Sequence, residues 1–253
     1  MIHPVPALSY ESALSEGIIL ADAAVTLAGR PVLRGITLHL KEHRIGIVGR
    51  NGSGKSTLLR LLSGLIAPDK GHVRVEGIDP TRERKAMLAH LGILFQNPDH
   101  QILFPTVEEE LAFGLVQMGV PKAQAQARVT AELARHGRSH WRGASVATLS
   151  QGQRHWLCLQ SVLLMQPRTI LLDEPLAGLD LPTQMRLART FSSLPQRLIT
   201  ITHDPANLSG CDRVIWLEGG AVAADGPPVQ VLPLFQAEMA RLGDLDADAD
   251  LAG

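Results

Sequence analysis

A glycine-rich segment with a lysine and two hydroxyl side chains carries the clearest chemistry in the sequence. It reads GRNGSGKST over residues 49–57, follows an apolar strand-like run and opens a leucine-rich helical stretch. The phosphate-binding pattern GxxxxGK[ST] requires this context, and a glycine-rich turn with a stray lysine is the disfavoured alternative. Glycines let the backbone N–H groups curl around an anion, and the helix dipole adds positive charge there. The predicted nucleotide-binding residues are Gly49, Asn51, Gly52, Ser53, Gly54, Lys55, Ser56 and Thr57.

Two side chains of this segment have distinct expected roles. Lys55 is expected to reach the β- and γ-phosphates of a nucleotide, and the Ser56 hydroxyl to ligate Mg²⁺. The tripeptide GKS or GKT occurs once in the sequence. We therefore expect a single nucleotide-binding unit in the chain.

Two adjacent carboxylates end an apolar run further along the chain. The run ILLDEP, residues 170–175, places Asp173 and Glu174 at its carboxyl end. Asp173 is predicted to serve the metal ion, and Glu174 to polarise or deprotonate the water that attacks the γ-phosphate. At the end of a strand the chain can turn both side chains toward one cleft, although strand neighbours normally face opposite sides. The alternative is that the two acids merely end a buried strand.

Two weaker signals lie at a helix start and at a strand end. The segment LSQGQ, residues 149–153, precedes a helical stretch that Ser150 can cap, and Gly152 permits close approach of an anion. A serine-capped helix is common, so the segment alone favours a structural role. His203 ends the run RLITITH, where a histidine alone would also be structural. The position of LSQGQ, after the phosphate-binding segment and before the two acids, favours a function for it.

A parallel sheet is needed to bring these residues together. The runs HRIGIVG, RTILLD and RLITITH read as strands buried on both faces, which is typical of parallel sheets. The runs IILADAAVTL, PVLRGITLHL and HVRVEG alternate like half-exposed antiparallel strands. RVIWLEGGAVAADG predicts two short strands around Gly219 and Gly220. The expected fold class is α/β, with a parallel sheet, a flanking antiparallel β subdomain and a helical insert.

The segment 97–148 is poor in strand formers and rich in helix signals. Thr106 and Glu109 have the spacing of a capping box at a helix start. Pro121 suits the first position of a second helix, and Gly137 suits its end. This segment predicts the helical insert.

The pattern predicts one domain with a tail. Residues 1–242 are expected to form a single domain, with a helical subdomain at about 97–165. The last eleven residues, 243–253, are acidic and lack aromatics, so a flexible tail is expected. A locally basic stretch in the insert predicts a solvated face, with contact to a membrane partner or lipid headgroups as the alternative. Its members are Arg128, Arg135, Arg138 and Arg142.

The composition argues against several classes of protein. The 253 residues include 24 basic and 25 acidic side chains, a formal net charge of −1, whereas nucleic-acid binders need a broad basic excess. Cys158 and Cys211 have neither CxxC nor Cys/His spacing, so no disulfide framework or metal site is predicted. The start of the chain lacks the features of a secretory signal, so a cytosolic protein is expected.

The motifs of residues 18–232 resemble those of the nucleotide-binding subunits of ATP-binding-cassette (ABC) transporters. They follow the family's order: phosphate loop, glutamine loop at Gln96, signature LSQGQ, ILLDE, an AGLD segment ending at Asp180, and the switch histidine His203. The resemblance implies a P-loop NTPase with an ABC-cassette core, in which two subunits sandwich two ATP molecules. Each ATP would contact one subunit's phosphate loop and the other's signature.

The resemblance also implies residue roles. The catalytic residues would be Glu174, His203 and Gln96, the metal ligands Ser56, Gln96 and Asp173, and the further nucleotide contacts Ser150, Gly152, Gln153 and Asp180. Ser150 and Gly152 would contact the ATP held by the other protomer, and His203 would bond to the γ-phosphate.

Within the family, residues 95–114 are the most informative. They read FQNPDHQILFPTVEEELAFG and resemble the glutamine-loop region of energy-coupling-factor (ECF) ATPases. The resemblance implies ATP-driven uptake of a vitamin or metal ion, biotin favoured and cobalt next. The partners would be a second ATPase subunit, expected to be an identical copy, a transmembrane scaffold subunit and a substrate-binding membrane protein. The chain would lie peripherally on the cytoplasmic face of the inner membrane.

Three positions depart from the family's pattern. Gln151 replaces the second glycine of the signature, and residues 41–44, KEHR, replace the usual Gly-Glu before the strand. Leu27 or Ala28 stands where many relatives place an aromatic ring against adenine. The missing ring would remove about 1–3 kcal/mol of base recognition, as judged from base–aromatic stacking elsewhere.

Two other functions are alternatives to transport. A non-transport ABC ATPase acting on nucleic acid usually has a long coiled-coil insertion or two cassettes, and the sequence has neither. A regulatory module that binds ATP without turnover is disfavoured by the presence of both Asp173 and Glu174.

Overall fold

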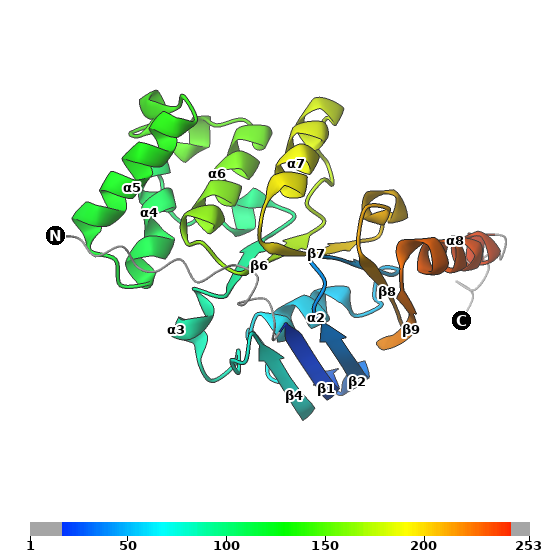
Figure 1. Cartoon of the computed structure of the whole chain (residues 1–253). Coiled ribbons are helices and arrows are strands. Elements are labelled where there is room, and N and C mark those ends of the chain that lie inside the picture. Colours follow the sequence, from blue (N-terminus) through cyan, green and yellow to red (C-terminus); the bar gives the residue numbers. More distant parts are fainter. Residues whose placement is uncertain (1–16, 244–253) are drawn as a thin grey trace.

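The core of the protein is a six-stranded sheet, seen in a computed structural model that describes residues 17–243 (Figure 1). The strand order is β5-β6-β7-β3-β8-β9, and β9 alone pairs antiparallel. The strands are β3 (Arg44–Val48), β5 (Leu91–Leu94), β6 (Thr169–Asp173), β7 (Arg197–Thr202), β8 (Arg213–Glu218) and β9 (Ala221–Gly226). Because helices cover both faces, β3, β6 and β7 are nearly continuous buried runs, which confirms the predicted parallel sheet.

A second sheet of three antiparallel strands flanks the core, also as predicted. Its order is β2-β1-β4, formed by β2 (Arg30–Leu40), β1 (Ile18–Leu27) and β4 (Lys70–Val75). Buried and exposed residues alternate along much of β2 and β4, because one face meets the core and the other meets solvent. Ala28 and Gly29 form the two-residue turn between β1 and β2, and both have positive φ, as a tight hairpin turn requires.

Helix α2 (Lys55–Leu62) lies between the two sheets (Figure 1). Its buried leucines join one hydrophobic cluster with β1, β2, β3 and β7. Both sheets and α2 therefore share a single core, and the loop at the start of α2 sits at the carboxyl edge of β3.

The helical insert forms a second lobe with its own hydrophobic cluster, drawn in green in Figure 1. It contains α4 (Val107–Gln117), α5 (Lys122–Arg135) and α6 (Gln151–Leu164), with short 3-10 turns at Pro98–His100, Ser139–Trp141 and Val146–Thr148. The Thr106 hydroxyl caps α4 by accepting from the Glu109 N–H at 3.4 Å. In a full capping box, the Glu109 carboxylate would accept from the Thr106 N–H. Here it accepts from the Thr106 hydroxyl instead, so the predicted capping box is only half formed.

Three further α-helices complete the described structure. The short α3 (Arg84–Met87) precedes β5, α7 (Leu181–Ser193) lies beside α6, and α8 (Pro228–Gly243) packs against β8. Gly243 is the last residue of α8, so the first residue of the predicted tail is helical, and the rest of that tail lies outside the described residues. Among residues 17–243, no helix is long and apolar enough to cross a membrane.

Candidate nucleotide-binding and hydrolysis site

The phosphate loop connects β3 to α2, and two of its glycines, Gly49 and Gly54, have no room for a side chain. A Cβ on Gly49 would lie 2.3 Å from the Leu217 carbonyl oxygen, and one on Gly54, whose φ is 104°, would lie 3.1 Å from the Val32 carbonyl oxygen. Lys55 is 8% exposed and folds back over the loop. Its Nζ donates to the Gly49 oxygen at 2.7 Å and to the Arg50 oxygen at 2.8 Å. The loop is therefore a closed turn with its cation held inside.

Most of the predicted site residues line one cavity of about 450 Å³ beside this loop. Its lining is Val32, Asn51, Gly52, Gly54, Lys55, Ser56, Thr57, Gln96, Asp173, Glu174 and His203. Gly49 and Ser53 shape the loop without lining the cavity. Ser53 is 3% exposed, and its Oγ has no hydrogen-bond partner among the described residues. Segments far apart in the sequence thus converge on one polar cavity.

Glu174 is the most firmly held side chain in the cavity. The Thr202 hydroxyl donates to Oε2 at 2.8 Å, and the His203 N–H donates to Oε1 at 2.8 Å. The Nδ1 atom of His203 lies 2.6 Å from the same Oε1. The backbone φ of Glu174 is 46°, a left-handed value that turns the chain sharply after β6. This turn sends Asp173 and Glu174 into the same cavity, as predicted.

Burial sets the electrostatics of the cavity. Burial raises the pKa of Asp173, and the negative charge of Glu174 raises it further. Burial lowers the pKa of Lys55, against the opposing pull of Glu174 and Asp173. A cation would stabilise the two carboxylates that line this cavity. Ser56, Gln96 and Asp173 offer the oxygen ligands that Mg²⁺ prefers. The residues present therefore fit a magnesium nucleotide.

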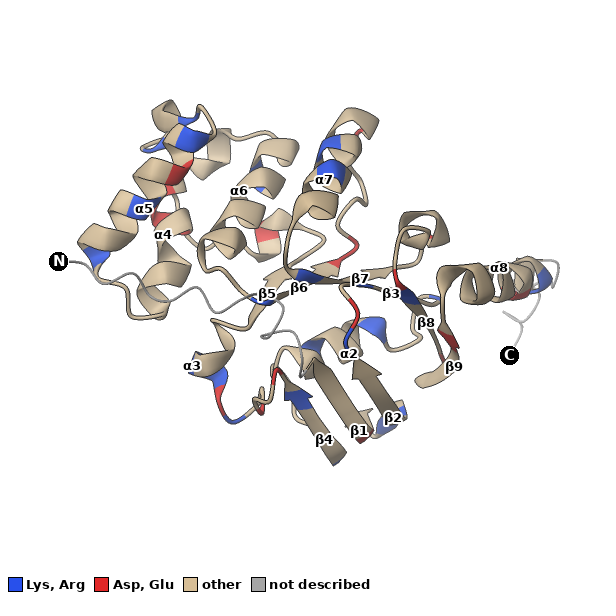
Figure 2. Ribbon diagram, in the orientation of Figure 1, with Lys and Arg blue, Asp and Glu red and all other residues tan. Residues whose placement is uncertain are grey.

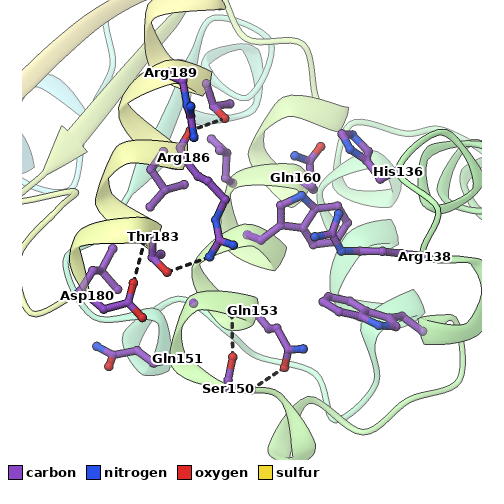
Figure 3. A pocket seen from close by; sticks show the side chains of 17 residues that line it. His136, Arg138, Ser150, Gln151, Gln153, Gln160, Asp180, Thr183, Arg186 and Arg189 are labelled. Atoms are coloured by element: carbon purple, nitrogen blue, oxygen red, sulfur yellow. Dashed lines mark hydrogen bonds between the residues drawn. The ribbon is translucent and has the colours of Figure 1, made fainter.

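The signature residues lie in a different cavity. Ser150 caps α6: its Oγ accepts from the Gln153 N–H at 3.3 Å, while Gln153 Oε1 accepts from the Ser150 N–H at 2.7 Å. Asp180 caps α7 by accepting from the Thr183 N–H at 2.7 Å. With Gly152, these residues line a cavity of about 820 Å³ between α6 and α7 (Figure 3). The cavity that contains Lys55 and Glu174 shares no lining residue with it.

Two features of the site were not reached by sequence reasoning. Thr202 holds Glu174, but a threonine in an apolar strand carries no functional signal of its own. Val32 lines the cavity from β2, whereas Leu27 and Ala28, the positions expected to face adenine, do not line it. No Phe, Tyr or Trp side chain lines this cavity within residues 17–243, and Tyr10 lies outside the described residues.

Replacement of Lys55 by alanine is expected to weaken ATP binding by about 10- to 100-fold, because it removes a charge-assisted contact to the phosphates. Equilibrium titration with a fluorescent ATP analogue measures the affinity. Lys122→Ala, at the exposed start of α5, is the matched control and should bind like the parent. Parent-like affinity in Lys55→Ala would contradict the role given to the loop.

Comparison with known proteins places this geometry in a family. Residues 33–177 match the family model described as ABC transporter. The chain is 52% identical over 227 residues to the biotin transport ATP-binding protein BioM of Rhodobacter capsulatus, covering 90% of this chain and 97% of the relative. It is 36% identical to the energy-coupling factor transporter ATP-binding protein EcfA of Syntrophomonas wolfei, covering 84% of this chain and 80% of the relative.

A solved structure gives the same result. The structure of cbiO1 from Clostridium perfringens, described as part of the ABC transporter complex cbiONQ, superposes with a TM-score of 0.73 at 30% identity. The match covers 91% of this chain and 95% of that one. The matched family model includes the phosphate loop, the signature and the two acids. The chain therefore belongs to the ABC transporter family, as one of its ATP-binding and ATP-hydrolysing subunits.

Proposed function

We propose that the chain is the ATPase subunit of an ECF-type importer and works as a homodimer. The observation that carries the dimer is the division of the predicted nucleotide contacts between two cavities. Lys55 and Glu174 line one cavity, and Ser150 and Gly152 line the other. Two copies facing each other would bring one copy's signature onto the other's nucleotide, and would form two equal sites.

Within each proposed site, the chain's own side chains divide the work. Lys55 and the loop N–H groups bind the phosphates, and Glu174 accepts a proton from the attacking water. Mg²⁺ held by Ser56, Gln96 and Asp173 would neutralise charge on the phosphates. Thr202 and His203 keep the Glu174 carboxylate in place through the bonds already described. His203 and Gln96 line the same cavity, where they can reach the terminal phosphate and the metal ion.

A mixture of two inactive variants tests the shared site. Lys55→Ala removes the phosphate grip, and Ser150→Arg blocks the signature. A mixed dimer would contain one site with an intact loop and an intact signature, because the two defects fall together in the other site. The mixture is therefore expected to hydrolyse ATP several times faster than either variant alone. A mixture as inactive as its components would contradict a site built from two copies.

A groove on the helical lobe supports a membrane partner. It measures about 510 Å³ and is lined by Phe104, Phe113 and Val116 together with charged residues of α4. The rings of Phe104 and Phe113 lie 5.1 Å apart, and the neighbouring Leu103 is 67% exposed. Apolar side chains with a charged rim are typical of surfaces that receive an amphipathic helix. We propose that coupling helices of a transmembrane scaffold dock here, and that the chain lies at the cytoplasmic face of the inner membrane.

The similarity to BioM supports biotin as the transported substrate, and the similarity to cbiO1 makes cobalt the second candidate. Purification of the tagged full chain from detergent-solubilised membranes tests this assignment. We expect a scaffold protein and a small substrate-binding membrane protein to co-purify, and the complex to retain labelled biotin. Retention of labelled cobalt without biotin would contradict the assignment of biotin as the substrate. Co-purification of nucleic acid without membrane proteins would overturn the transport role.

A further inference from the structure

The cavity that contains Ser150 extends well beyond the signature. It runs between α6 and α7 to the turn at Ser139–Trp141, and three arginines line it: Arg186 and Arg189 from α7, and Arg138 from the segment after α5 (Figure 3). Asp180 is the one acidic side chain lining this part of the described structure, and it is engaged as the cap of α7. Figure 2 shows the basic segments on α7 and beyond α5. The cavity therefore carries an excess of positive charge.

Arg138 is the most enclosed of the three arginines. Its guanidinium carbon lies 4.2 Å from the ring centroid of Trp156 and 4.9 Å from that of Trp141. Burial lowers its pKa, and the charge of Arg186 lowers it further. The other arginines of this basic stretch are exposed, as expected for a solvated face, whereas Arg138 is only partly exposed because two rings pack against it. Stacking leaves the edge N–H groups of a guanidinium free to donate.

None of the three arginines forms an ion pair with a carboxylate of residues 17–243. Arg186 donates only to the Thr183 hydroxyl, at 2.8 Å. Nearby arginines behave differently: Arg135 pairs with Glu132 and Arg142 pairs with Glu108. The missing acidic partners are thus a property of the cavity and not of the whole lobe.

Gln160 adds an unsatisfied acceptor to the same cavity. Its side chain is 3% exposed, and its Oε1 has no hydrogen-bond partner among the described residues. A buried amide oxygen without a partner costs about 1–3 kcal/mol relative to a bonded one. A ligand with a hydroxyl or amino group would supply the missing donor.

We propose that this cavity binds a small molecule that carries a phosphate group and a hydroxyl or amino donor. A phosphate matches three unpaired arginines, because the guanidinium fork binds its oxygens in pairs. The volume of about 820 Å³ is in the range of small-molecule sites. The arginines line the cavity of the signature residues and not that of the phosphate loop, so a free ligand would lie beside the nucleotide that the proposed dimer brings to Ser150.

Ribose 5-phosphate is the probe, because it has both a phosphate and hydroxyl donors. The full chain with Lys55→Ala is used, because this change weakens phosphate binding at the phosphate loop. Trp141 and Trp156 line the cavity, so their fluorescence reports occupancy. We expect a saturable change that neither ribose nor chloride at equal ionic strength produces. Arg186→Gln, at an exposed position, should weaken the affinity by about tenfold or more, whereas Arg135→Gln, outside the cavity, should leave it unchanged.

Three results would overturn the proposal. One is the absence of a saturable change, and another is equal affinity in Arg186→Gln and in its parent. The third is a silent probe combined with a higher ATP requirement for hydrolysis in Arg186→Gln that retains Lys55. In that case the arginines would serve the nucleotide of the second copy and not a free ligand. Each result leaves the complementation test of the dimer unaffected.

Discussion

Replacement of Glu174 by glutamine should leave ATP bound and slow its hydrolysis by about 100-fold or more, the size of effect that removal of a general base produces. Glutamine keeps the shape of the side chain and can still accept from Thr202, but it cannot take a proton from water. The bound ATP would then keep its contact with the signature of the second copy. We expect the variant to elute as an ATP-dependent dimer in size-exclusion chromatography, with little release of phosphate.

Glu238→Gln is the matched control for this experiment. Glu238 lies on α8, where it pairs with Arg241, and it does not line the cavity that holds Glu174. Its hydrolysis rate should equal that of the parent. Hydrolysis at the parent rate in Glu174→Gln would show that another group activates the water.

Removal of Arg197 should cause the largest loss of stability, about 3–5 kcal/mol in the free energy of unfolding. Arg197 and Glu76 form a fully buried ion pair that joins β7 to the end of β4. The guanidinium also donates to the Glu42 carbonyl oxygen at 3.1 Å. Arg197→Met would leave the Glu76 charge buried without its partner. Urea unfolding followed by circular dichroism measures the change.

Two further variants separate this effect from ordinary loss of an arginine. Arg213→Gln removes the partly exposed pairs with Glu42 and Asp225 and should cost about 1 kcal/mol or less. The double variant Glu76→Gln with Arg197→Met should regain part of the lost stability, because no unpaired charge remains. A loss in Arg197→Met no larger than in Arg213→Gln would show that the buried pair contributes little.

Much of the fold could be predicted from continuous patterns in the sequence. The runs that form β3, β6 and β7 are apolar throughout because both faces are buried, and the glycines at 49, 52 and 54 mark the loop that follows β3. The strand β5 was missed because its four residues, LGIL, are too few to show the hydrophobic pattern of a strand. Its Gly92 has a structural reason, since a Cβ there would lie 2.4 Å from Val162.

The parts of the site that escaped prediction depend on contacts between distant segments. Thr202 reaches Glu174 only because β6 and β7 pair in parallel with Asp173 opposite Ile201. Arg138 belongs to a basic stretch in the sequence. It is enclosed because Trp141 packs against Trp156, with the two ring centroids 5.4 Å apart. The spacing of residues along the sequence predicts neither the Thr202–Glu174 contact nor the enclosure of Arg138. The assignments of catalytic, metal and nucleotide contacts therefore stay predictions until the variants are measured.

Helix α6 belongs to two hydrophobic clusters at once. Leu157 packs in the cluster of the helical lobe, whereas Cys158, Leu159 and Val162 pack beneath β6. The helix has 14 residues and is therefore about 21 Å long. The helix can tilt as a rigid body around the residues that pack against the large sheet. A tilt of about 5° around Leu159 would move Ser150, which lies about 14 Å away along the helix axis, by about 1 Å.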